Sequence, residues 1–152
     1  MRSPFISLIA TITIDGRIAR HEDHFSYEWA TPQDQAQLAK DIAEQDVLLV
    51  GHRSYHMYRH LFEGKRCIMF TREIDGVEEQ GENLIRLNPN KIVLADFLKT
   101  LGVQKAAVVG GNSVYSFCLH RGMVDQMLLT VEPIIFGEGL SLFDGVKDSR
   151  NF

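Results

Sequence analysis

Residues 106–115, Ala-Ala-Val-Val-Gly-Gly-Asn-Ser-Val-Tyr, contain a short apolar strand that runs into two glycines and then directly into a helical pattern. Because glycine has no Cβ, backbone N–H groups at such a turn can approach a ligand closely. The unpaired N–H groups and the positive end of the helix dipole that follow favour a phosphate. The stretch therefore indicates either a site for the pyrophosphate of a nucleotide or a tight strand-to-helix corner.

Strands and helices alternate on both sides of this turn. Apolar runs predict strands, listed by residue number: 5–14, 46–51, 67–70, 84–87, 108–109, 127–131 (continued by 133–136 beyond a break) and 140–143. Helices are expected from Thr31-Pro32 through Ala43, and at 53–61, 90–101 and 112–120, whereas 17–28 and 75–83 are expected to be loops. This alternation predicts βαβ units and a mainly parallel sheet with helices on both faces.

The composition narrows the class of protein. With 152 residues, 45% of them hydrophobic, the chain is expected to form one globular domain over 1–152. A net charge of −4 and the lack of a long basic stretch argue against a nucleic-acid partner. The apolar runs are too short to span a membrane, and the N-terminus lacks a signal-peptide layout. Cys67 and Cys118 read as separate buried thiols, so we expect a cytoplasmic enzyme or binding domain.

Six motifs between Ile6 and Asp144 follow one another in a recognisable order. They are ISLIA (6–10), WxxPxD (29–34), GHRSY (51–55), GKRCIMFTRE (64–73), VGGxxVY (109–115) and LLT (128–130). The chain thereby resembles the dihydrofolate reductase superfamily, which also contains the reductase domains of riboflavin biosynthesis. The resemblance implies a three-layer α/β fold, with a mostly parallel twisted sheet between helices and an antiparallel C-terminal edge. It also implies NADPH as cofactor.

The resemblance assigns the reaction chemistry to Asp34, supported by Thr130 and placed by the spacing from Trp29. A carboxylate in an apolar pocket can hold the amino-pyrimidine edge of a pterin and promote protonation of the ring nitrogen. From the residues alone, Asp34 also suits the first turn of a helix, where an acid stabilises the helix dipole.

The remaining site residues are carried over by the same motifs. Ile9, Ala10 and Leu38 match positions that line the substrate pocket, and Lys65 replaces an arginine that holds the glutamate tail of folate. Arg72 matches a contact to the 2′-phosphate of NADPH. The full set matched to cofactor binding is Ala10, Gly51, Arg53, Ser54, Thr71, Arg72, Gly110, Gly111, Ser113, Val114 and Tyr115.

Two enzyme functions follow from the resemblance. The leading hypothesis is reduction of 7,8-dihydrofolate to tetrahydrofolate. The alternative is reduction of a ribosylaminopyrimidine in riboflavin biosynthesis, which the segments at 15–19 and 133–143 favour, although no Asp-Asp-Pro stretch follows Gly51. The chain ends at Phe152, before the strand that normally completes the sheet edge, so a homodimer formed through that edge is a further expectation.

A non-catalytic nucleotide-binding or metal-binding module is the third hypothesis. His52, His56 and His60 are spaced to lie on one stripe of a helix and could bind a metal ion. The polar stretch from His21 to His24 is another candidate, although such loop residues are usually just solvated.

Overall fold

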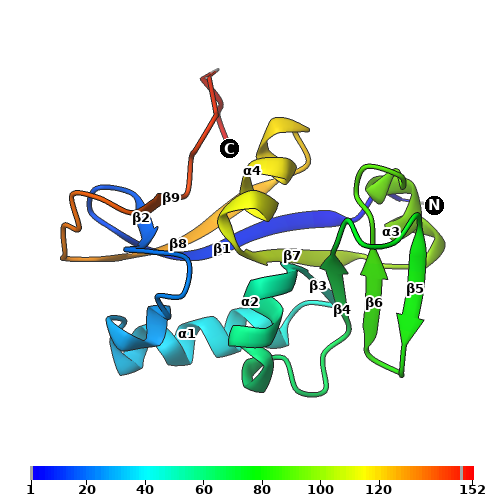
Figure 1. Ribbon diagram of the computed structural model, residues 1–152, viewed down its shortest axis with the longest axis horizontal. Coiled ribbons are helices and arrows are strands. Elements are labelled where there is room, and N and C mark those ends of the chain that lie inside the picture. The colour runs from blue at the N-terminus through cyan, green and yellow to red at the C-terminus, as the bar shows by residue number, and fades with distance from the viewer. Residues whose placement is uncertain (1, 148) are drawn as a thin grey trace.

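The computed structural model describes residues 2–147 and 149–152. Its main sheet has the strand order β5-β6-β4-β3-β7-β1-β8 (Figure 1). Its strands are β1 (Phe5–Thr13), β3 (Val47–Gly51), β4 (Cys67–Phe70), β5 (Val77–Gln80), β6 (Leu84–Leu87), β7 (Lys105–Gly110) and β8 (Gln126–Glu132). The helices are α1 (Pro32–Ala43), α2 (His52–Met57), α3 (Leu94–Thr100) and α4 (Asn112–His120), with 3₁₀ turns at Ser26–Glu28 and Arg59–Leu61. The predicted α/β class is confirmed.

The strand pairings are parallel except at one edge. β1 pairs in parallel with β7 and β8, and β3 pairs in parallel with β4 and β7, whereas β5 runs antiparallel to β6. The expected antiparallel element near the C-terminus is present, but outside this sheet. There β9 (Leu140–Ser141) pairs with β2 (Arg17–Ala19), and 133–136 forms no strand.

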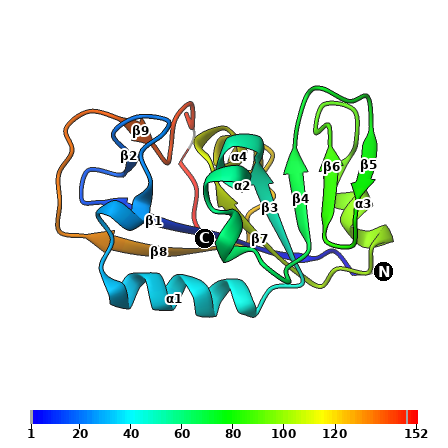
Figure 2. The same ribbon diagram turned by 60° about the horizontal axis from the view of Figure 1, so that its bottom comes forward.

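Helices cover both faces of the sheet, as Figures 1 and 2 show for α1 on one side and α4 on the other. Leu8 and Val108 pack with α3 and α4 in one cluster, while Leu48 packs with α1 and α2 in the other. Leu8, Leu48 and Leu98 have no exposed surface. Burying each such side chain stabilises the fold by about 1.5–3 kcal/mol, so the two clusters fix the layers.

Both ends of α1 are tied to the sheet layer by polar contacts. The Thr31 side chain accepts the N–H of Asp34 at 3.3 Å, which confirms the predicted N-cap. The Thr31 N–H in turn donates to the buried Glu132 carboxylate at 2.9 Å. At the other end, the Lys65 ammonium donates to the carbonyls of Ala43 and Gln45, both at 2.7 Å. These contacts hold α1 beside β1 and β8.

Some predicted elements differ from the observed ones. The loop expected at 75–83 contains β5, whose residues are all exposed and whose pairing with β6 is reinforced by Arg86 contacting Glu78 at 3.2 Å. The helix expected at 53–61 ends at Met57, and the one expected at 90–101 begins at Leu94. Within the described ranges, no helix is long and apolar enough to cross a membrane.

Candidate active site

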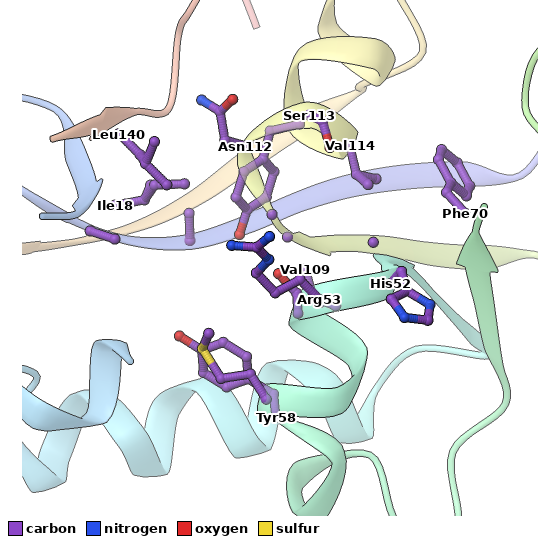
Figure 3. A pocket seen from close by; sticks show the side chains of 18 of the residues that line it. Ile18, His52, Arg53, Tyr58, Phe70, Val109, Asn112, Ser113, Val114 and Leu140 are labelled. Carbon is purple, nitrogen blue, oxygen red and sulfur yellow. The ribbon is translucent and has the colours of Figure 1, made fainter. Parts of the chain in front are cut away.

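A cavity of about 700 Å³ opens at the carboxyl ends of β3, β4 and β7 (Figure 3). β3 leads into α2 and β7 leads into α4, and these two helices pack against opposite faces of the sheet. In open α/β sheets, ligands bind where neighbouring strand connections diverge in this way. The cavity is therefore placed where a cofactor or substrate is expected.

Glycines bring the first turns of α2 and α4 into contact at the centre of the cavity. A Cβ on Gly111 would lie 2.9 Å from the Ser54 Oγ, and one on Gly51 would lie 3.2 Å from a Val114 methyl group. Gly110 has a φ of +129°, and the Gly110–Gly111 peptide bond is cis. The N-cap of α4 is Gly111, which has no side chain to cap the first N–H groups. The N–H groups of Val114 and Tyr115 donate to the Gly111 carbonyl, whereas those of Asn112 and Ser113 have no hydrogen-bond partner among the described residues and can donate to an anion.

Tyr115 joins the glycine turn to the floor of the cavity. Its hydroxyl donates to the Ile9 carbonyl of β1 at 2.7 Å, and the side chain is almost fully buried. Burial raises the pKa of Tyr115 well above its ordinary value, so the hydroxyl stays protonated. The bond fixes α4 against β1.

Two positively charged side chains line the cavity together with the glycine turn. Figure 3 shows Arg53 extending from α2 into the cavity, where its guanidinium contacts Glu22 and, at 3.6 Å, Asp23. Arg72 lines the cavity beyond the end of β4. Its neighbour Glu73 is paired with Arg86 on β6 at 2.8 Å. Two guanidinium groups and the N-terminus of α4 thus line the same cavity, a combination suited to phosphate groups.

Comparisons with known proteins identify the fold. No protein-family model matches the chain. It is 23% identical to the uncharacterized protein YyaP of Bacillus subtilis, over 96% of this chain and 84% of YyaP. It superposes on a Thermotoga maritima diaminohydroxyphosphoribosylaminopyrimidine deaminase/5-amino-6-(5-phosphoribosylamino)uracil reductase with a TM-score of 0.73 at 20% identity, over 97% of this chain and 50% of that one. A pyrimidine reductase-like protein from Corynebacterium diphtheriae gives 0.72 at 18% identity, over 98% and 83%. The chain has the dihydrofolate reductase-like fold.

Within this dihydrofolate reductase-like fold, most of the predicted site residues come together. Those that line the cavity are Ile9, Ala10, Leu38, Gly51, Arg53, Ser54, Thr71, Arg72, Gly110, Gly111, Ser113, Val114 and Tyr115. They come from five separate segments of the chain. The fold, and not closeness in sequence, therefore brings these residues to one cavity.

Four predicted residues do not line the cavity. Asp34 lies partly exposed in the first turn of α1, and Thr130 lies on β8 opposite Thr11. The Trp29 ring packs against Phe136 with the ring centres 5.2 Å apart. The catalytic roles of Asp34, Thr130 and Trp29 stay predictions, and the geometry of the cavity does not support them. Lys65 is engaged with the end of α1, which gives its ammonium a structural role in place of the expected substrate contact.

His24, Ser26 and Tyr58 form a polar group at the cavity wall. Sequence reasoning named His24 only within a candidate metal-binding stretch and gave no site role to Ser26 or Tyr58. The His24 Nδ1 accepts the N–H of Arg20 at 3.0 Å, and burial lowers the pKa of His24. The Tyr58 hydroxyl donates to the Ser26 Oγ at 2.8 Å and accepts the Ser26 N–H at 3.0 Å. The aromatic residues within the stretch 17–28 were the available signal that this segment packs rather than remaining a solvated loop.

The proposed histidine stripe for a metal ion is wrong. Because α2 ends at Met57, His60 is not part of the helix that carries His52 and His56. The His60 ring packs against Phe25, with ring centres 5.9 Å apart, whereas the ring centres of His52 and His56 are 4.6 Å apart. Across the part of the chain that the structure describes, no three His, Cys, Asp or Glu side chains are grouped to hold a metal ion.

Proposed function

We propose that this protein is an NADPH-dependent reductase that transfers a hydride to a C=N bond of a small pyrimidine-type substrate. The observation that carries the proposal is the glycine turn at the start of α4, which lines one cavity together with Arg53, Arg72 and the apolar Ile9 and Ala10. The fold neighbours that bear the name of pyrimidine reductases support this class of substrate.

The cavity fits a dinucleotide cofactor at the turn. A Cβ on Gly111 would fill the space beside Ser54, so the glycine keeps backbone N–H groups accessible to a pyrophosphate. Arg72 and Thr71, which follow β4, would hold a 2′-phosphate. Ile9 and Ala10 would form the apolar wall against a nicotinamide ring. A bound reduced nicotinamide supplies the hydride.

Dihydrofolate is the weaker substrate hypothesis once the side chains are placed. Its main support was a carboxylate at Asp34 inside the pocket, and Asp34 does not line the cavity. The lysine expected to contact the glutamate tail of folate is bound to backbone carbonyls instead. We therefore favour the pyrimidine reductase class.

A substitution at the glycine turn tests the cofactor site. Gly111→Ala places a methyl group against Ser54 and should weaken NADPH binding by about tenfold, equivalent to roughly 1.4 kcal/mol. Gly76→Ala is the matched control, since a Cβ there meets nothing within 4 Å. Binding would be followed by calorimetry, and reduction of a ribosylaminopyrimidine by the loss of NADPH absorbance. Equal affinities for both variants, or a wild-type protein that does not bind NADPH, would refute the proposal.

A further inference from the structure

The residue that follows Arg72 is a carboxylate, and both side chains line the cavity. Arg72 and Glu73 come directly after Thr71, at the end of β4, and both belong to the cavity lining. The proposed function places the 2′-phosphate of NADPH at Arg72. A free Glu73 carboxylate would repel that phosphate and would compete with it for the Arg72 guanidinium. This end of the cavity therefore suits a phosphate only if the charge of Glu73 is engaged elsewhere.

Arg86 on β6 engages the Glu73 carboxylate from outside the cavity. Its guanidinium contacts Glu73 at 2.8 Å and Glu78 on β5 at 3.2 Å. β6 lies between β4 and β5, as Figures 1 and 2 show, and Arg86 is opposite Glu78 in the antiparallel pair. Only 15% of the Arg86 side chain is exposed, against 71% for Glu73, and Arg86 does not line the cavity. The largely buried guanidinium thus holds the exposed carboxylate at β6.

The two guanidinium groups that line the cavity differ in their partners. Arg53 is paired with two carboxylates from the segment that precedes α1. No carboxylate among the described residues pairs with Arg72. A phosphate that binds Arg53 has to displace its carboxylate partners, whereas a phosphate that binds Arg72 displaces none of those described. The engagement of Glu73 by its partner on β6 is what leaves Arg72 available.

The backbone after β4 is held by contacts that do not involve Arg86. The Thr71 N–H donates to the Leu87 carbonyl at 2.9 Å. The side chain of the buried Asn88 donates to the Ile74 carbonyl at 2.7 Å. Because these bonds fix the segment to the end of β6, removal of the Arg86 guanidinium should release the neighbouring carboxylate and leave the backbone in place.

We infer that Arg86 is a positioning residue that sets the preference of this protein for NADPH over NADH, because it holds Glu73 away from the 2′-phosphate. The inference rests on the proposed function, in which that phosphate lies at Arg72. NADPH and NADH differ only in the 2′-phosphate. Loss of Arg86 should therefore weaken the binding of NADPH and leave that of NADH unchanged, whereas loss of a residue needed only for the fold would affect both alike.

Calorimetric titration of the intact protein with each dinucleotide measures this preference. Arg86→Met should bind NADPH about fivefold more weakly than wild type, equivalent to roughly 1 kcal/mol, with an unchanged affinity for NADH. Arg86→Gln removes the same charge with a polar side chain and serves if the methionine variant does not fold. Arg66→Met is the matched control, because it removes a positive charge just before the start of β4 and Arg66 does not line the cavity.

Double variants separate Glu73 from the other partner of Arg86. Arg86→Met combined with Glu73→Gln should recover the NADPH affinity of wild type to within about twofold, because the carboxylate that Arg86 neutralised is gone. Arg86→Met combined with Glu78→Gln should not recover it, since Glu78 contacts Arg86 but does not line the cavity. The loss in Arg86→Met should also shrink at high salt, because repulsion between exposed charges is screened.

The outcomes distinguish the inference from the proposed function. Equal losses of NADPH and NADH binding in the Arg86 variants, or equal recovery by Glu73→Gln and Glu78→Gln, would overturn the inference and leave the proposed function intact. The same holds for a wild-type protein that binds NADPH and NADH equally well. A wild-type protein that binds neither dinucleotide would refute the proposed function and the inference with it.

Discussion

Tyr115→Phe removes one buried hydroxyl and keeps the ring that packs between the glycine turn and β1. The hydroxyl donates to the Ile9 carbonyl at 2.7 Å inside the core. A buried hydrogen bond between neutral groups contributes about 1 kcal/mol net, and an acceptor left unpaired adds a desolvation penalty of similar size. We therefore expect the free energy of unfolding to fall by about 2 kcal/mol, which corresponds to a drop in Tm of roughly 4–8 °C for a chain of this length.

Urea denaturation followed by circular dichroism measures this difference, and Tyr55→Phe is the matched control. Tyr55 packs against a core cluster, but its hydroxyl makes no hydrogen bond within the part of the chain that the structure describes. The control should change stability by less than about 0.5 kcal/mol. Because burial raises the pKa of Tyr115, the difference between wild type and Tyr115→Phe should be the same at about pH 6 and pH 9. A loss no larger than that of the control would refute the assignment of this bond.

Three further predictions concern side chains outside the glycine turn. Lys65→Met removes both hydrogen bonds to the end of α1 and should cost about 1–2 kcal/mol in urea denaturation, whereas the exposed Lys40→Met should cost little. Burial lowers the pKa of His24 below 6.5. The buried neutral imidazole therefore contributes its full stabilisation above about pH 6.5, and this contribution is lost as the pH falls below that value. The free energy of unfolding of His24→Gln should therefore decline less steeply than that of wild type on acidification, and parallel curves would contradict this. Burial raises the pKa of both Cys67 and Cys118 to about 12, so a thiol reagent should label them only after unfolding, and rapid labelling of the native protein would argue against their burial.

The strands of the sheet were predictable where the residue pattern is compatible with only one kind of secondary structure. The runs at 5–14, 46–51 and 67–70 are apolar on consecutive positions, which requires burial on both faces and hence a central parallel strand. β1, β3 and β4 occupy these positions. The Thr31-Pro32 pair likewise fixes the start of α1, because a capping side chain and a proline at the first helical position both fit only there.

Elements whose stability comes from contacts distant in sequence were not predictable in this way. β5 consists of Val-Glu-Glu-Gln, with every residue exposed, so its strand conformation depends on pairing with β6 rather than on its own pattern. The end of α2 at Met57 is similar. His60 has the spacing to continue the helix, but its ring packs against Phe25 and Tyr27 from a segment that the sequence suggested to be a loop.

Asp34 shows why site residues are harder to assign than the fold that carries them. Its spacing from Thr31 and Pro32 is satisfied equally by a pocket carboxylate and by an acid in the first turn of a helix. What separates the two is how far along α1 the cavity reaches. Asp34, Leu38 and Ile42 are four residues apart and therefore lie on one face of the helix. Ile42 is buried and Leu38 lines the cavity, whereas Asp34, in the first turn of the helix, lies outside the lining. The face that α1 presents to the cavity therefore followed from the spacing of its residues. The point along the helix at which the cavity ends did not, because it depends on the segments that close the cavity beside the first turn of α1.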